Sequence, residues 1–363
     1  MEKRGKIGEN QLLCLLFVLL LVPALRLFPT ASAKLSGKSG WISALIALPV
    51  GLIYAAFLSK MSSLCQARSL NEALGGRVGR FFSLLFSLWF TLYAAFLLRS
   101  GSQRLVNAIY FESPPAFFSL TMAAVCLFAA SCSALVLARF AKLVLPFLGA
   151  VLALVLVFSL LSADASRLGP LTLYSLSDAV PGAVAALDVI CAIAVTKFFL
   201  DRERPVGTVS GRGDALWVVL ASLLLAALDI ALLGNLGAGL TGRLSLPFFS
   251  LVQCLTFFGS VERVEALVVA MWIFPDMLFV SVLLHCAEDL LDSVFLSARF
   301  SLFGVSGSLL LPSLLSAVLS CLLAREPAAL TLWSERLIPG INLLFSFVVM
   351  PVLFLFLRRK KRP

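Results

Sequence analysis

The sequence has few charged side chains and a single histidine. Charged residues make up 13% of its 363 positions, whereas a soluble domain carries about 25%. A soluble fold of this length would therefore expose too much apolar surface. One histidine, His285, is too few for a histidine-based zinc site or a Ser-His catalytic pair. The sequence also has no phosphate-binding G-x-x-x-x-G-K-[ST] motif. We therefore expect neither an enzyme nor a metal or cofactor site.

The chain is equally short of paired cysteines. Its eight cysteines include no C-x-x-C pair, and most of them lie inside apolar runs. This pattern is typical of neither a disulfide framework nor a metal site. The net charge is +10, but the basic residues fall in the gaps between apolar runs. That distribution indicates membrane topology signals and no nucleic-acid partner.

Long apolar runs are what the sequence has instead, because 61% of its residues are hydrophobic. A membrane span needs about 20 predominantly apolar residues. Ten such spans fill nearly the whole chain, so we expect an all-α integral membrane protein with a single transmembrane domain. A shorter helix at 245–258 should lie at the surface. The expected spans are residues 11–30, 41–58, 81–106, 115–137, 141–161, 180–200, 215–236, 264–286, 305–323 and 337–357.

The basic residues also predict an orientation. With both termini in the cytoplasm, about twice as many basic residues fall on the cytoplasmic side as outside, as the positive-inside rule requires. An alternative is a cleaved signal peptide, since Ala31-Ser32-Ala33 follows a basic start and an apolar stretch. Cleavage would leave nine spans and reverse the orientation. The length of the apolar stretch and its two prolines favour an uncleaved first span.

Prolines interrupt two of the expected spans at matching places. Pro23 and Pro29 lie in the first span, and residues 168–170 and 181–182 precede and enter the sixth, five spans later. Interrupted helices at equivalent positions are typical of inverted-repeat transporter folds with a site near the midplane. We expect a LeuT-like fold with broken helices 1 and 6. Its two five-helix repeats would be residues 1–163 and 164–363.

Short motifs along the chain keep the order and spacing of one known family. They are SGWISAL at 39–45, SLNEALGGRVG at 69–79, and shorter matches at 98–99, 113–114, 138–147, 164–170, 246–248 and 261–273. The set resembles the spore germination permease family, the B subunits of nutrient germinant receptors, in the amino acid–polyamine–organocation superfamily. The resemblance implies a spore inner-membrane subunit that senses a small nutrient, such as an amino acid. It also implies A-type and lipoprotein C-type subunits as partners.

Two regions depart from that family. Where the family has a Gly-x-Gly turn in span one, this chain reads Pro23-Ala24-Leu25-Arg26. Where span six of the family carries Gly and Glu, residues 193–197 read IAVTK. Both regions face the ligand in the related fold, so the resemblance implies the fold more firmly than the ligand.

Charged residues at bilayer depth are the strongest functional candidates. Each costs about 2.5–3.5 kcal/mol on insertion scales, so such residues face a cavity or a partner. Arg26, Asp188, Asp229 and Asp276 fall within expected spans. Arg26 could bind a ligand carboxylate and Asp188 an ammonium or a proton, or the two could neutralise each other as a structural pair. The candidate ligand-binding residues are Ala24, Leu25, Arg26, Tyr93, Phe96, Asp188, Cys191, Trp272 and Asp276.

Three functions remain open at this point. The first is the nutrient-sensing receptor subunit that the resemblance implies. The second is an active secondary amino-acid transporter coupled to H⁺ or Na⁺, which the intramembrane aspartates favour. The third is a scaffold subunit without a ligand, which the missing Gly-x-Gly turn favours.

Overall fold

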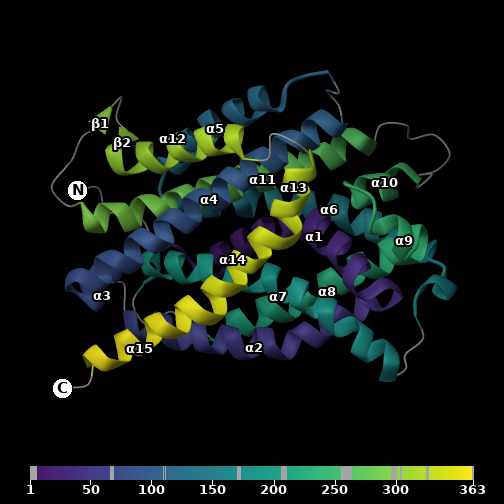
Figure 1. Ribbon diagram of the computed structural model, residues 1–363, viewed down its shortest axis with the longest axis horizontal. Helices are drawn as coiled ribbons and strands as arrows, with labels where there is room; N and C mark the ends of the chain where they lie inside the picture. The colour runs from purple at the N-terminus through teal and green to yellow at the C-terminus, as the bar shows by residue number, and fades with distance from the viewer. Residues whose placement is uncertain are drawn as a thin grey trace.

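The computed structural model is almost entirely helical where it is described (Figure 1). Its helices and two short strands run as α1 Glu9–Ser36, η1 Gly37–Ser39, α2 Gly40–Cys65, α3 Leu70–Leu74, α4 Gly76–Ala108, α5 Pro115–Ala130, α6 Ala134–Leu161, η2 Ala165–Arg167, α7 Leu173–Leu200, η3 Asp201–Glu203, α8 Gly211–Leu236, α9 Ala238–Thr241, α10 Pro247–Cys254, α11 Val264–Val294, β1 Ser301–Leu302, β2 Val305–Ser306, α12 Gly307–Leu322, α13 Pro327–Leu332, the π-helical η4 Trp333–Leu337, α14 Ile338–Leu344, the π-helical η5 Phe345–Val349 and α15 Met350–Lys361. The structure describes residues 6–65, 69–108, 110, 112–169, 173–205, 211–254, 264–295, 301–302, 305–323 and 327–361.

Several of these helices are long and apolar enough to cross a bilayer, which makes the chain a multi-pass membrane protein. Six helical segments of the described chain meet this standard, and the first of them, Glu9–Cys65, joins α1 to α2 through η1. Two shorter apolar helices are α5 and α12. Large apolar side chains face outward, and Phe128, Leu143 and Leu161 are 75%, 76% and 80% exposed. Such a surface is suited to lipid contact.

The expectation that the first and sixth helices are broken is wrong. The helix α1 continues through Pro23 and Pro29, and α7 continues through Pro181. Proline removes one backbone donor and crowds the preceding turn, but membrane helices tolerate it when neighbouring groups bond the backbone. In α7, the N–H of Gly182 donates to Ser36 Oγ at 2.9 Å, so α1 supplies that neighbour.

The boundary between the expected fourth and fifth spans also moves. We expected the fourth span to reach residue 137, but α5 ends at Ala130 and α6 begins at Ala134. The hydroxyl of Ser131 donates to the carbonyl oxygen of Phe128 at 2.6 Å, and Ser133 precedes α6 in an extended conformation. Small polar residues such as these compete with helical bonding and favour turns.

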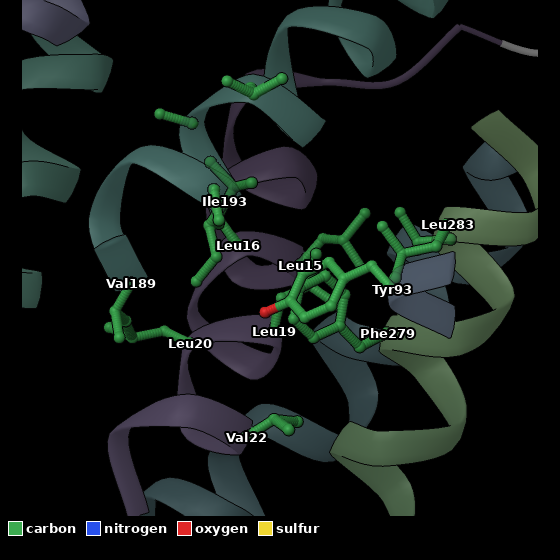
Figure 2. Packing of buried hydrophobic residues seen from close by; sticks show 14 of the residues in the cluster. Leu15, Leu16, Leu19, Leu20, Val22, Tyr93, Val189, Ile193, Phe279 and Leu283 are labelled. Carbon is green, nitrogen blue, oxygen red and sulfur yellow. The ribbon is translucent and has the colours of Figure 1, made fainter. Parts of the chain in front are cut away.

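Helix α1 lies inside the bundle, where it packs against α6, α7, α8 and α11. Figure 2 shows its leucines, including Leu15 and Leu19, between Val189 and Ile193 of α7 and Phe279 of α11. The expected helix at 245–258 is present as α10, with residues 255–258 outside the described chain. It is not a plain surface helix, because it buries one apolar face against α1, α8 and α11.

Different helices and loops lie at the two ends of the bundle. Helix α3 and the last turns of α15 lie together at one end, here called the terminal end (Figure 1). The start of α1 lies there too, because Ile7 donates its backbone N–H to the carbonyl oxygen of Glu203 at 3.1 Å. The loop segments around η1, η2 and α9 lie at the opposite end, here called the far end.

Candidate functional site: a basic chamber at the far end

A chamber of about 270 Å³ opens at the far end between α1, α4, the segment joining α9 to α10, and α13 with η4. Its charged lining is predominantly basic. Four basic side chains and one carboxylate from the described residues line it, and its seven other polar lining residues are neutral. The charged lining residues are Arg26, Lys34, Arg104, Arg243 and Glu335. The neutral polar ones are Thr30, Ser100, Gln103, Asn107, Ser245, Thr331 and Ser334.

Arg104 is held behind the chamber by an ion pair. Its Nη2 donates to Asp276 Oδ2, and each residue is only 2% exposed. The guanidinium carbon also lies 6.0 Å from the ring centroid of Trp272, a cation–π distance. Gly101 of α4 makes room for the carboxylate, because a Cβ there would lie 3.0 Å from Asp276 Oδ2. The guanidinium of Arg104 is thus fixed by α11 from two sides.

Arg26 lines the same chamber from α1 and lies within electrostatic range of both Arg104 and Asp276. Among the described residues, no carboxylate is within ion-pair distance of its guanidinium. Two guanidinium groups therefore share one buried carboxylate. This arrangement leaves an excess of positive charge facing the chamber.

Lys34 and Glu335 form an ion pair that links α1 to η4 at the chamber. Their side chains are 41% and 34% exposed, so this pair lies toward the mouth. It contributes little stability at such exposure, but it connects two elements that a ligand in the chamber would contact.

The structure places Asp188 away from this chamber. Its Oδ1 accepts a hydrogen bond from Nδ2 of Asn342 at 2.8 Å, and Asn342 Oδ1 accepts from Nε1 of Trp89 at 3.2 Å. The polar cluster is buried between α4, α7 and α14. The predicted structural pair between Arg26 and Asp188 is therefore wrong, and of the two residues only Arg26 lines the chamber.

Five other predicted ligand residues lie in the apolar core and do not line the chamber. Tyr93 packs edge-on against Phe279 of α11, with ring centroids 5.4 Å apart (Figure 2). The five are Ala24, Leu25, Tyr93, Phe96 and Cys191, each at most 2% exposed. Trp272 and Asp276 do not line the chamber either, but both contact Arg104, which does.

Sequence reasoning missed the residue on which this geometry depends. Arg104 falls inside the expected span at 81–106, yet it is absent from the predicted ligand-binding residues. The argument that singled out Arg26 applies to it equally. By contrast, the sequence could not predict that Lys34, Arg243 and Glu335 line one chamber. These residues lie far apart in the sequence, and only the fold brings them together.

The intramembrane aspartate of α8 has a structural partner. Asp229 accepts a hydrogen bond from the Ser32 hydroxyl of α1, and its exposed fraction is zero. Within the part of the chain that the structure describes, no group of three His, Cys, Asp or Glu side chains could hold a metal ion.

An ion-pair cluster lies at the terminal end, opposite the chamber. Lys197 Nζ is 2.7 Å from Asp201 Oδ2 and 3.0 Å from Asp214 Oδ1. Arg204 Nη1 is 3.3 Å from Asp201 Oδ1, and its Nη2 is 3.9 Å from Glu9 Oε2. The cluster joins α1, α7, η3 and α8. Along α1, the buried leucines labelled in Figure 2 lie between Glu9 of this cluster and Arg26 of the chamber, so an apolar layer separates the two charged regions.

Comparison with known proteins agrees with this architecture. The family described as "Spore germination protein" matches residues 6–326. Spore germination protein KB of Bacillus subtilis (strain 168) is 23% identical over 373 residues, which cover 98% of this chain and 93% of that protein.

Two solved transporters are similar in fold. One is a Na⁺-coupled sialic acid symporter in a substrate-bound, outward-open state, with a TM-score of 0.61 and 13% identity over 95% of this chain and 80% of the symporter. The other is Mhp1, a nucleobase-cation-symport-1 family transporter, in a closed conformation with bromovinylhydantoin bound. Its TM-score is 0.64 and its identity 12%, over 97% of this chain and 82% of Mhp1. At this identity, the likeness concerns the fold alone.

Proposed function

This chain belongs to the spore germination protein family, and we propose that it is the membrane subunit of a spore nutrient germinant receptor. In this proposal it senses a small nutrient, such as an amino acid, in the basic chamber at the far end. The observation that carries the proposal is the chamber itself, which has charged walls in a chain of this family. A volume of about 270 Å³ suits a metabolite of few atoms.

The mechanism would be a ligand-linked shift between two conformations. A ligand changes such an equilibrium only by binding one conformation more tightly than the other. Here the chamber walls come from α1, α4 and η4, and the Lys34–Glu335 pair already links α1 to η4. A ligand that contacts all three elements would favour the conformation in which they are close together. Partner subunits would respond to that conformation.

We further propose ten spans in two five-helix repeats of inverted topology, at residues 1–163 and 164–363. The fold likeness to the two symporters supports this arrangement. Both termini would face the cytoplasm across the spore inner membrane. Support comes from the common location of the start of α1 and the end of α15, followed by basic residues, as the positive-inside rule requires. An A-type subunit and a lipoprotein C-type subunit would be the partners.

A secondary transporter is the second candidate, which the likeness to the two symporters favours. Transport requires a path that opens alternately at both ends. Here the chamber opens at the far end, and the apolar layer around α1 lies between it and the terminal ion-pair cluster. Gradient-driven uptake of an amino acid into reconstituted vesicles would favour this function. Absence of uptake across a broad amino-acid panel would exclude it.

Deletion of the gene in the parent organism tests the proposed function. Spores without it should lose germination in response to at least one nutrient, and the wild-type gene supplied in trans should restore that response. Unchanged germination with every nutrient would refute the receptor role. A scaffold role without a ligand would be refuted by saturable binding of any small molecule to the purified chain.

A further inference from the structure

We infer that the chamber recognises its ligand through a carboxylate group, held by the guanidinium groups of Arg26 and Arg104, and that it does not require an amino group on the ligand. This inference deepens the proposed function, on which it rests for the view that the ligand is a nutrient. Its physical basis is the charge of the chamber, the unused donors of Arg104, and the engaged state of the nearby carboxylates.

The first observation is the charge imbalance at the inner wall of the chamber. Arg26 and Arg104 both line it, and the single carboxylate within range, Asp276, already pairs with Arg104. An uncompensated charge is costly at bilayer depth. A bound anion would supply the missing negative charge. No described carboxylate lies within ion-pair distance of Arg26 to supply that charge.

The second observation is that Arg104 has hydrogen-bond donors to spare. Its Nε and Nη1 are buried and have no partner among the described residues, while its Nη2 bonds Asp276. The residue is only 2% exposed and yet lines the chamber. Buried donors without partners are uncommon in folded proteins and call for an explanation. A ligand oxygen that reaches one of these donors from the chamber would satisfy it.

The third observation concerns geometry. A guanidinium is a planar fork of donors that matches the two oxygens of a carboxylate. Trp272 lies 6.0 Å from the guanidinium carbon of Arg104 and Asp276 holds its Nη2, so that fork is oriented before any ligand binds. A preoriented donor raises affinity because less conformational freedom is lost on binding.

An ammonium group finds no comparable partner in this chamber. Glu335, the lining carboxylate, pairs with Lys34. The other nearby carboxylate, Asp276, bonds Arg104 through Oδ2; its Oδ1 has no hydrogen-bond partner but does not line the chamber. An ammonium would therefore enter a net positive field. A ligand that carries a carboxylate alone should bind about as well as the corresponding zwitterion.

Matched chemical probes test this inference on the purified full-length chain in lipid nanodiscs. Three sets differ in size: alanine, propionate and ethylamine; leucine, 4-methylpentanoate and 3-methylbutylamine; phenylalanine, 3-phenylpropanoate and phenethylamine. Isothermal titration calorimetry measures each affinity. In at least one set, the acid should bind within about tenfold of the amino acid, and the amine should bind at least about a hundredfold more weakly. Binding of an amine without its acid, or of no acid at all, would overturn the inference.

Two variants connect the binding to the residues. Arg26→Gln should lower the binding affinity for the acid by about tenfold or more, since a hydrogen bond to a charged group is lost. Arg167→Gln is the matched control, because Arg167 lies in η2 at the same end of the bundle, is about half exposed in its pair with Asp164, and does not line the chamber. It should change the affinity less than about threefold. Equal affinities in wild type and Arg26→Gln would overturn the inference.

Thermal unfolding without ligand separates a binding role from a structural one. Arg26→Gln removes an unpaired charge, so the melting temperature should stay constant or rise. A fall would mean that Arg26 serves an internal partner, which would overturn the inference. The proposed function fails separately: if acids bind through Arg26 but gene deletion leaves germination intact, the carboxylate site stands and the receptor role does not. If deletion abolishes a response while only amines bind, the receptor role stands and the carboxylate site does not.

Discussion

Asp201→Asn should destabilise the protein more than the substitution of any other carboxylate in the terminal ion-pair cluster. Asp201 accepts from Lys197 Nζ at 2.7 Å, from Ser62 Oγ at 2.8 Å and from Arg204 Nη1 at 3.3 Å. It is therefore the only cluster carboxylate of the described chain that contacts both cations within 3.5 Å. The cluster holds Lys197 and Arg204 against Asp201 and Asp214, so its buried charges balance. Loss of one carboxylate leaves an excess positive charge.

The magnitude follows from what the remaining partners can do. Removal of one member of a buried ion pair costs about 3–5 kcal/mol. Lys197 keeps Asp214 at 3.0 Å, and Arg204 keeps the distant oxygen of Glu9 at 3.9 Å. We therefore expect about 3 kcal/mol for Asp201→Asn, at the lower end of that range. Lys197→Met leaves an excess negative charge and should cost about the same.

The double substitution restores the balance of charge. Asp201→Asn combined with Lys197→Met should cost less than the sum of the two single effects, by about 2 kcal/mol, which is a typical coupling for residues in contact. Reversible unfolding in mixed detergent micelles, followed by circular dichroism, measures all three free energies. Lys34→Gln is the control, because its half-exposed pair should contribute below about 1 kcal/mol. Additive effects of the two single substitutions would refute the reasoning.

Two further substitutions test the packing of α7. Asn342→Leu removes the donor that holds Asp188 Oδ1 at 2.8 Å, so the unfolding free energy should fall by about 1–3 kcal/mol, and an equal stability would contradict the hydrogen bond. Gly182→Ala adds a Cβ that would collide with the hydroxyl oxygens of Ser36 and Ser43. Its cost should be about 1–3 kcal/mol by thermal or detergent unfolding. Replacing Ser36 and Ser43 together by glycine should reduce that cost; no reduction would show that the collision is not its cause.

The helices were predictable because a membrane span can be recognised from the length and hydropathy of its apolar run. Each expected span overlaps a helix of the described chain, and Pro115 begins α5 as expected. The ten-span count stays a prediction, since the described residues supply six long apolar segments and two shorter ones. The prolines were misread, because whether Pro23 or Pro181 interrupts a helix depends on neighbours such as Ser36 that hold the backbone from outside.

The site was predictable only in part, for a related reason. Intramembrane charge singled out Arg26 and Asp276, because a charge at that depth needs a cavity or a partner; the structure places Arg26 in the chamber lining and pairs Asp276 with Arg104. The charge pattern could not identify the partner. Arg104 comes from α4 and Asp276 from α11, 172 positions apart in sequence, and Asp188 takes Asn342 from α14. Tyr93 and Phe96 also illustrate the limit, since an aromatic residue in a central span packs into a core as readily as it lines a site.

The dose response of spore germination tests the central claim most directly. Spores of the parent organism would carry Arg26→Gln at the native locus, beside spores with Arg167→Gln and with the wild-type chain. For the nutrient that requires this gene, Arg26→Gln should raise the half-maximal concentration by about tenfold or more, as the loss of a charged hydrogen bond predicts. Arg167→Gln, outside the chamber, should stay within about threefold of wild type. An unchanged dose response in Arg26→Gln spores that contain normal amounts of the protein would contradict nutrient sensing in the basic chamber.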